Sequence, residues 1–232
     1  MATVMLLFTS YLDLRKREVE DKVWIAFGAL GAVLEAYEVL TGATSAFSLF
    51  VSVGLAALVG FSIFYFGLYG GADAKALIVL AVLVPYFKPN VGIYQIVPLI
   101  VLTNGVLLSM TLPVALFLLN IARVISGQKI FDGFDESRLR KLLACFLGYR
   151  STGKPRAFQF PMEKTLQSNN MGSVTARKRF DFSFMQDEFE KTPGTWVTPG
   201  IPLLVFFTFG FLALLTYGDI VIGLISLLTR IF

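Results

Sequence analysis

The chain has 232 residues, of which 56% are hydrophobic and 16% charged, and its mean hydropathy is +0.72. Soluble domains carry about 25% charged residues, so this composition indicates a polytopic membrane protein with a small water-exposed part. The net charge of +4 predicts no nucleic-acid partner, because the basic residues lie in loops beside apolar stretches. The lack of histidine and the single cysteine, Cys145, exclude a Cys/His zinc site and an internal disulfide. We expect Cys145 to be a small core residue.

Apolar stretches predict about six membrane-spanning helices, each of which needs roughly 20 apolar residues or fewer where protein shelters its ends. In chain order the stretches are Ala2–Leu12, Val23–Leu40, Phe47–Leu68, Ala74–Phe87, Ile93–Arg123 and Pro199–Phe232. The first is short, and the fourth is short and interrupted at Pro85. Kinks are expected at Pro98 and Pro113, and the last stretch is broken at Gly218-Asp219.

The basic residues predict the orientation of these helices. Lysine and arginine follow the first, third and fifth stretches, and thirteen of the twenty lie between Arg123 and Lys191. The positive-inside rule then places both chain ends outside the cell. Asp13, at the end of the first stretch, and Asp73, at the start of the fourth, are therefore expected at the same, cytoplasmic membrane face.

The charged block predicts a small cytoplasmic α+β insert in an otherwise all-α membrane protein. We expect three regions: a membrane domain 1–125 with both aspartates, the insert 126–195, and a last membrane helix with an apolar tail, 196–232. In the insert, Asp135 is expected to cap a helix ending near Leu147. Its apolar stripe, expected on the bilayer surface, comprises Leu139, Leu142, Leu143, Phe146 and Leu147. Antiparallel strands are predicted where phenylalanines alternate with polar residues, at Phe158/Phe160 and Phe180/Phe182/Phe184, on either side of a turn-rich run 167–173.

Two aspartates beside turns suggest proteolysis. Asp73 ends the glycine turn Gly70-Gly71-Ala72-Asp73, and Asp13 opens a run of basic and acidic residues. Two carboxyl groups that share one proton can activate a water and polarise a peptide carbonyl, with no metal or other cofactor. Glycines let a peptide approach closely and can adopt positive φ. The simpler interpretations are an N-cap for Asp73 and a boundary charge for Asp13.

These residues carry a family resemblance. Gly70-Gly71-Ala72-Asp73 resembles the GxGD motif of membrane aspartyl proteases, with alanine for the last glycine, and Asp73-Ala74-Lys75 resembles the Asp-x-Lys continuation of type IV prepilin peptidases. The run from Asp13 to Asp21 resembles their first-aspartate motif, with Val19-Glu20 in place of Ile-Pro. This difference and the insert are most similar to archaeal preflagellin (prearchaellin) peptidases.

The resemblance implies an aspartyl endopeptidase of the cell membrane with Asp13 and Asp73 as catalytic residues and Gly70, Gly71 and Lys75 as motif or substrate-binding residues. Its substrate would be an archaellin or archaeal pilin-like precursor, cut at the cytoplasmic face between a basic leader and a hydrophobic helix in the bilayer. The segment 196–202, rich in proline, would either help dock the substrate or only begin the last helix.

The alternative function is that of a proton-coupled transporter or of a pilus or archaellum assembly factor. Neither Asp13 nor Asp73 is expected at mid-bilayer, where coupling sites lie. Glu35, Glu38 and Asp219 are interpreted as boundary charges near the opposite face.

Overall fold

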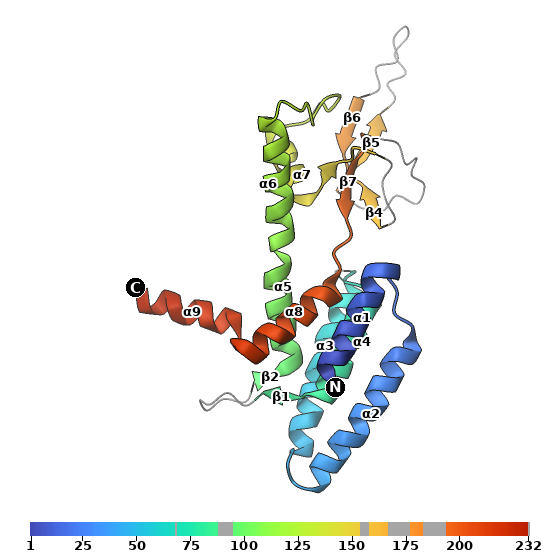
Figure 1. Cartoon of the computed structure of the whole chain (residues 1–232), viewed down its shortest axis with the longest axis vertical. Helices are drawn as coiled ribbons and strands as arrows, with labels where there is room; N and C mark the ends of the chain where they lie inside the picture. The colour runs from blue at the N-terminus through green and yellow to red at the C-terminus, as the bar shows by residue number, and fades with distance from the viewer. Residues whose placement is uncertain (68, 88–94, 154–157, 167–176, 183–193, 232) are drawn as a thin grey trace. The chain divides into compact units, whose positions relative to one another are not determined.

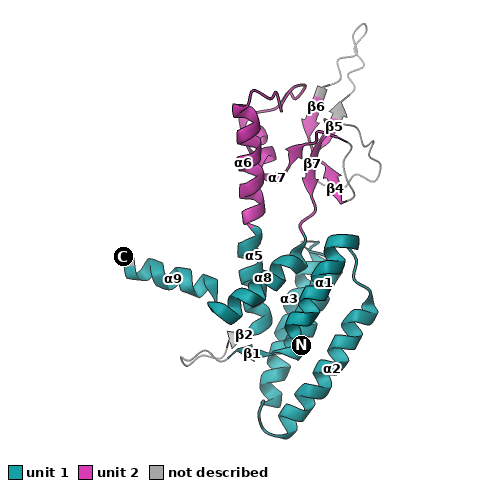
Figure 2. Ribbon diagram, viewed as in Figure 1, with its two compact units in different colours: residues 1–109, 202–232 teal, residues 110–201 magenta. Residues whose placement is uncertain are grey.

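The computed structural model describes residues 1–67, 69–87, 95–153, 158–166, 177–182 and 194–231. It has two compact units (Figure 2). Unit 1 comprises residues 1–109 and 202–232 and is helical, and unit 2, residues 110–201, contains the larger sheets. Phe184 and the turn-rich run 167–173 lie outside the described residues.

Unit 1 begins with four helices joined by short connections (Figure 1). Its elements are α1 (Ala2–Lys16), α2 (Asp21–Leu40), α3 (Ala46–Tyr65), α4 (Gly71–Leu83), β1 (Tyr86–Phe87), β2 (Gln95–Ile96), α5 (Val97–Ser109), α8 (Leu203–Thr216) and α9 (Ile220–Ile231). The short strands β1 and β2 pair antiparallel. Helix α4 ends at Leu83, shortly before Pro85, because proline disfavours the helical conformation of the residue that precedes it.

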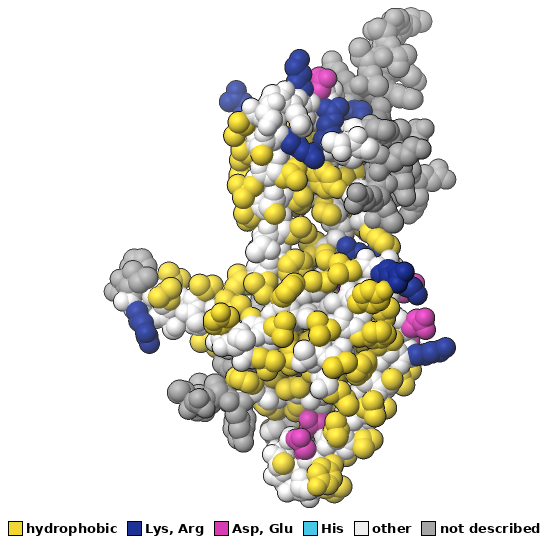
Figure 3. All heavy atoms as spheres, in the orientation of Figure 1, with side chains coloured by type: hydrophobic (Ala, Val, Ile, Leu, Met, Phe, Trp, Pro, Cys, Tyr) yellow, Lys and Arg dark blue, Asp and Glu magenta, His cyan; other side chains and the backbone are white. Residues whose placement is uncertain are grey.

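The predicted helical stretches are present, but a count of six membrane spans is not confirmed. Three described segments are long and apolar enough to cross a membrane: Asp21–Leu40, Ala46–Tyr65 and Val97–Ile125. A fourth is reached if α8 and α9, which meet at 56°, form one broken span. Helices α1 and α4 have only 15 and 13 residues. Apolar side chains cover much of the visible face of unit 1 (Figure 3).

Small and polar residues allow the helices of unit 1 to pack closely. A β-carbon on Gly210 of α8 would lie 2.8 Å from the Val101 carbonyl oxygen of α5, so the two backbones touch there. Between α1 and α8, Ser10 donates to the Leu204 carbonyl at 2.8 Å and Thr208 to that of Leu6 at 3.1 Å. Helix α1 is thus fixed to α8 by buried hydrogen bonds as well as by apolar packing.

The break between α8 and α9 is built by polar groups. Gly218 has φ +89, a conformation that glycine adopts without strain. The Asp219 carboxylate accepts from the Val221 and Ile222 N–H groups at 2.9 and 3.1 Å, and Asn104 of α5 donates to the Gly218 carbonyl. Asp219 therefore caps α9, a more specific role than the boundary charge expected from the sequence.

The described part of unit 2 has two helices and two small antiparallel sheets with an aromatic core. Its elements are α6 (Thr111–Ile125), α7 (Arg138–Leu147), β3 (Tyr149–Arg150), β4 (Gln159–Pro161), β5 (Glu163–Leu166), β6 (Arg177–Phe180) and β7 (Trp196–Pro199). Strands β3, β7 and β4 form an antiparallel sheet with β7 in the middle, and β5 pairs with β6. Trp196 is fully buried and stacks on Phe131 at 5.4 Å. The predicted small antiparallel sheet with a helix is confirmed.

Two details of unit 2 differ from the sequence-based expectations. The cap of α7 is Ser137, whose hydroxyl accepts from the Arg140 N–H, because the helix begins at Arg138, two residues later than an Asp135 cap requires. Cys145 is buried, as expected, and Leu139 of the apolar stripe is 66% exposed, which is compatible with the expected place of that stripe on the bilayer surface. Residues 196–199, expected either to help dock the substrate or to begin the last helix, form the central strand β7 because Trp196 belongs to the core.

Candidate active site

Asp13 lies in the last turn of α1, beside an unusual helix end. The next turn closes at Arg17, which has φ +56 and donates its backbone N–H to the Asp13 carbonyl at 3.0 Å. Non-glycine residues rarely adopt this left-handed conformation. The Arg17 guanidinium Nη1 lies 3.9 Å from Asp13 Oδ2, and both side chains are mostly buried, 23% and 14% exposed. The end of α1 thus places a cation beside the first predicted catalytic carboxylate.

Asp73 is the third residue of α4 and faces back toward the start of that helix. Its Oδ2 accepts the Gly70 N–H at 3.0 Å, while the Asp73 N–H donates to the Gly70 carbonyl at 3.1 Å. This pair satisfies two backbone groups that the helix start leaves open. Asp73 therefore caps α4, as the simpler interpretation predicted. Only its Oδ2 accepts the Gly70 N–H, and its Oδ1 takes no part in that hydrogen bond.

The two aspartates belong to one electrostatic site. The pKa of Asp73 is raised to about 7, mainly because the carboxyl group is buried. The negative charge of Asp13 adds to this rise, whereas the hydrogen bond from the Gly70 N–H and the positive charge of Arg17 lower the pKa. Burial also raises the pKa of Asp13, and Arg17 lowers it. Helices α1 and α4 are in contact, so Asp13 and Asp73, sixty residues apart, lie close enough to interact. No hydrogen bond joins the two carboxyl groups in the described part of the chain.

Gly70 and Gly71 leave space beside the Asp73 carboxyl group, and neither adopts the positive φ that glycine permits. Gly70 has φ −75 and ψ 159, an extended conformation that any residue adopts, and Gly71 is the first residue of α4. A β-carbon on Gly70 would lie 3.5 Å from Asp73 Oδ2, and one on Gly71 would lie 3.5 Å from the Phe64 ring. Side chains at these positions would therefore narrow the approach to the Asp73 carboxyl group.

Lys75, the last motif residue, forms an ion pair that the sequence did not reveal. Its Nζ lies 2.5 Å from Oδ1 of Asp21 in the first turn of α2. Both side chains are substantially exposed, so the pair contributes at most about 1 kcal/mol. It joins the beginning of α4 to the beginning of α2. Lys75 therefore has a structural partner in addition to any contact with substrate.

Two further residues of the site were missed by sequence reasoning. The only signal for Arg17 was its spacing of four residues from Asp13, which places both on one face of a helix. Tyr69 precedes the glycine turn, and burial together with the Asp73 charge raises the pKa of its phenol. Tyr69 also packs against the buried core of unit 1.

Helix α3 packs directly against the first turn of α4. A β-carbon on Gly60 would lie 3.3 Å from the Ala74 Cα and carbonyl oxygen, so α3 touches the α4 backbone next to Asp73. Leu77 and Leu80 anchor the same helix in the buried core. The described residues contain no group of three or more acidic, cysteine or histidine side chains that could hold a metal ion. Their chemistry at this site is that of two carboxyl groups, a guanidinium and backbone amides.

Comparisons with known proteins identify the family of this chain. Residues 1–114 match the model of the type IV leader peptidase family, and residues 140–220 match that of the archaeal peptidase A24 C-terminus, type II. The chain is 28% identical to a preflagellin peptidase of Methanocaldococcus jannaschii over 97% of this chain and 95% of that protein. Preflagellin peptidases of Methanococcus voltae and Methanococcus maripaludis are each 27% identical, over 95% and 92% of this chain and 94% and 92% of their own lengths. Both catalytic candidates fall within the first matched region, and the chain belongs to the type IV leader peptidase family of proteases.

Proposed function

We propose that the protein is a membrane aspartyl endopeptidase that removes the leader peptide from archaellin or archaeal pilin-like precursors, with Asp13 and Asp73 as its catalytic pair. The observation that carries this proposal is the shared electrostatic site: the charges of Asp13 and Arg17 both act on the buried Asp73 carboxyl group. Family membership favours a peptidase over the transporter or assembly factor that the sequence also allowed.

The surroundings of the two aspartates suggest different roles for them. Arg17, 3.9 Å from Asp13, stabilises the ionised form of that carboxylate and suits it to act as the general base. Asp73, whose burial raises its pKa to about 7, keeps a proton on a large fraction of molecules near neutral pH. It is suited to act as the general acid. The arrangement matches the acid and base pairing that metal-free peptide hydrolysis requires.

The proposed reaction proceeds in two steps. Asp13 takes a proton from a water as the water oxygen attacks the scissile carbonyl carbon, and Asp73 gives its proton to the carbonyl oxygen. In the second step the resulting diol returns a proton to Asp73, Asp13 protonates the leaving nitrogen, and the carbon–nitrogen bond breaks. Both carboxyl groups return to their starting states, so the cycle needs no cofactor.

The substrate follows from the relatives and from the position of the site. The similar proteins are preflagellin peptidases, whose name gives preflagellin as their substrate. Under the positive-inside orientation, the ends of α1 and α4 that carry Asp13 and Asp73 lie at the cytoplasmic face. A precursor helix in the bilayer would present its leader junction at this level. In this arrangement residues 1–125 form the membrane domain, 126–195 the cytoplasmic insert, and 196–232 the strand β7 followed by the last membrane helix and its tail.

The test is cleavage of a purified preflagellin by the detergent-solubilised protein, followed by N-terminal sequencing of the product. We expect Asp13→Asn and Asp73→Asn each to reduce cleavage by at least about 100-fold, because each removes one proton-transfer group. Asp132→Asn, at an exposed aspartate of unit 2, is the matched control and should cleave normally. Near-normal cleavage by either active-site variant would show that this aspartate has only a structural role.

A further inference from the structure

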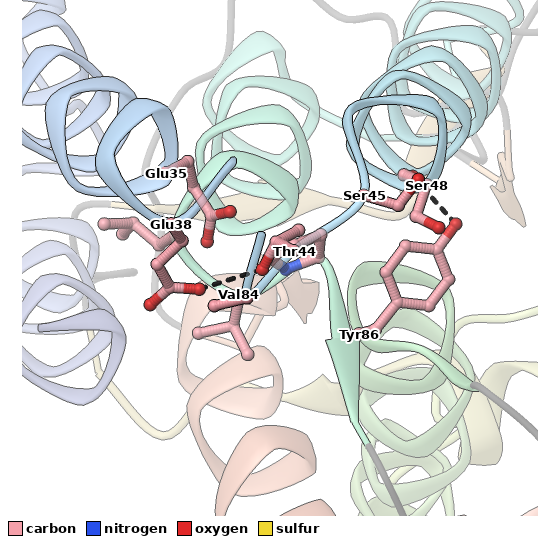
Figure 4. A pocket seen from close by; sticks show the side chains of 10 residues that line it. Glu35, Glu38, Thr44, Ser45, Ser48, Val84 and Tyr86 are labelled. Atoms are coloured by element: carbon pink, nitrogen blue, oxygen red, sulfur yellow. Dashed lines mark hydrogen bonds between the residues drawn. The ribbon is translucent and has the colours of Figure 1, made fainter. Parts of the chain in front are cut away.

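A second polar site lies at the opposite end of α4 from Asp73. A cavity of about 380 Å³ opens there, where α2 and α4 end and α3 begins (Figure 4). Its walls combine acidic, hydroxyl and apolar side chains, and none of the described residues that line it is basic. The lining residues used below are Glu35, Glu38, Thr44, Leu83 and Val84.

Glu35 is the most unusual group in this cavity. Its residue is only 5% exposed, and Oε2 has no hydrogen-bond partner. A buried carboxylate without a partner is costly, and buried charges in proteins are normally paired. Figure 4 shows the Glu35 side chain directed from α2 toward α4, into the space that the cavity occupies. Glu35 is therefore a buried group of this cavity, whereas the sequence suggested only a boundary charge.

Glu38 supplies a second carboxylate one helical turn later. Residues three apart lie on one helix face, and both glutamates line the cavity. Thr44 Oγ1 donates to Glu38 Oε2 at 2.9 Å, which fixes the side chain and leaves Oε1 for another donor. Neither glutamate forms an ion pair within the described ranges of the chain.

The backbone around the cavity also favours positive charge. The carbonyl ends of α2 and α4 carry partial negative charge, and one helix start, that of α3, opposes them. The site thus presents two carboxylates and two helix C-termini, and the described residues around it supply no counter-ion. The opposite wall, Leu83 and Val84, is apolar.

We propose that this cavity binds a primary ammonium group carried on a short hydrocarbon. An ammonium has three donors, which the carboxylates of Glu35 and Glu38 can accept, and its methylene groups would contact Leu83 and Val84. A divalent metal ion fits less well because it prefers six or more oxygen ligands, whereas one wall here is apolar. The cavity lies at the ends of two helices that are apolar enough to cross a membrane. An amino lipid headgroup and a soluble amine are the two sources of this chemistry.

The experiment measures thermal unfolding of the whole protein with each type of amine. One arm titrates spermidine in detergent, and the other compares nanodiscs of phosphatidylcholine with nanodiscs that also contain phosphatidylethanolamine. We expect a saturable rise in the melting temperature in at least one arm, and the responding arm identifies the source. Glu35→Gln and Glu38→Gln should weaken half-saturation at least about ten-fold, equivalent to about 1.4 kcal/mol. Asp132→Asn should respond like the wild type.

Each variant should fold, since Glu35→Gln removes a buried charge and Glu38→Gln keeps an oxygen for Thr44. The proposal is overturned if neither arm gives a saturable response or if the glutamine variants respond like Asp132→Asn. It is also overturned if MgCl₂ at equal ionic strength gives the saturable response that Glu35→Gln abolishes. Precursor cleavage, measured separately, tests the peptidase and does not decide this site.

Discussion

Replacing Asp73 with asparagine should stabilise the protein while it abolishes cleavage. Burial raises the pKa of Asp73 from its usual 3.8 to about 7, and at 1.36 kcal/mol per pH unit this costs the ionised folded state about 4 kcal/mol. Asp73 is partly exposed, and solvent screening reduces that cost to an expected value of about 2 kcal/mol. Asparagine cannot ionise, and its side-chain oxygen can still accept the Gly70 N–H.

The sign of the effect follows from proton linkage. A carboxyl group whose pKa is raised on folding binds its proton more tightly in the folded state, so its contribution to stability is greatest below pH 3.8. That contribution is lost as the pH rises from 3.8 to about 7 and stays lost above this range. The difference between Asp73→Asn and wild type should therefore be near zero at pH 4 and reach its full value at pH 8.

The assay is thermal unfolding in detergent at pH 4, 6 and 8, followed by tryptophan fluorescence in a Trp196→Phe background, so that the signal comes from Trp24, which is buried in the same core as α4. A gain of about 2 kcal/mol corresponds to a rise of about 4 to 8 °C for a chain of this length. Asp132→Asn controls for the loss of one negative charge. A melting temperature equal to that of wild type at pH 8, or a gain that does not vary with pH, would refute the reasoning from burial.

Three further predictions concern the site and its orientation. Arg17→Gln should slow cleavage roughly two- to five-fold at pH 5.5 and less at pH 8, because Asp13 loses the cation that favours its ionised form; a uniform loss across the pH–rate profile would contradict this. Gly70→Val should enter the membrane normally, since φ −75 suits valine, but cleave at least about ten-fold more slowly because its methyl groups crowd the peptide path, a cost of about 1.4 kcal/mol; wild-type kinetics would show that the turn only starts a helix. In an otherwise cysteine-free chain, Ala43→Cys should react with an impermeant thiol reagent from outside intact cells and Gly153→Cys should not; the reverse pattern would place both aspartates outside.

The sequence by itself determined the parts of the protein that depend on local pattern. Apolar runs located the helices of unit 1, because a helix in an apolar environment must satisfy its backbone groups internally. Pro85 and Gly218-Asp219 marked two helix boundaries, since proline restricts the local backbone conformation and glycine allows conformations that other residues rarely adopt. The motif around Asp73 indicated the family, and the position of each aspartate beside a helix end was visible in the same way.

Only the tertiary structure decided how distant segments meet. The pairing of Lys75 with Asp21 joins two helices whose contact no periodicity predicts. Residues 196–199 became the central strand β7 because Trp196 fills the core of unit 2, a result of packing and not of β-propensity. Glu35 carried no sequence signal that separates a boundary charge from a buried one. Its burial depends on where α2 and α4 end relative to each other, and the pKa of Asp73 likewise depends on how much of its surface other helices cover.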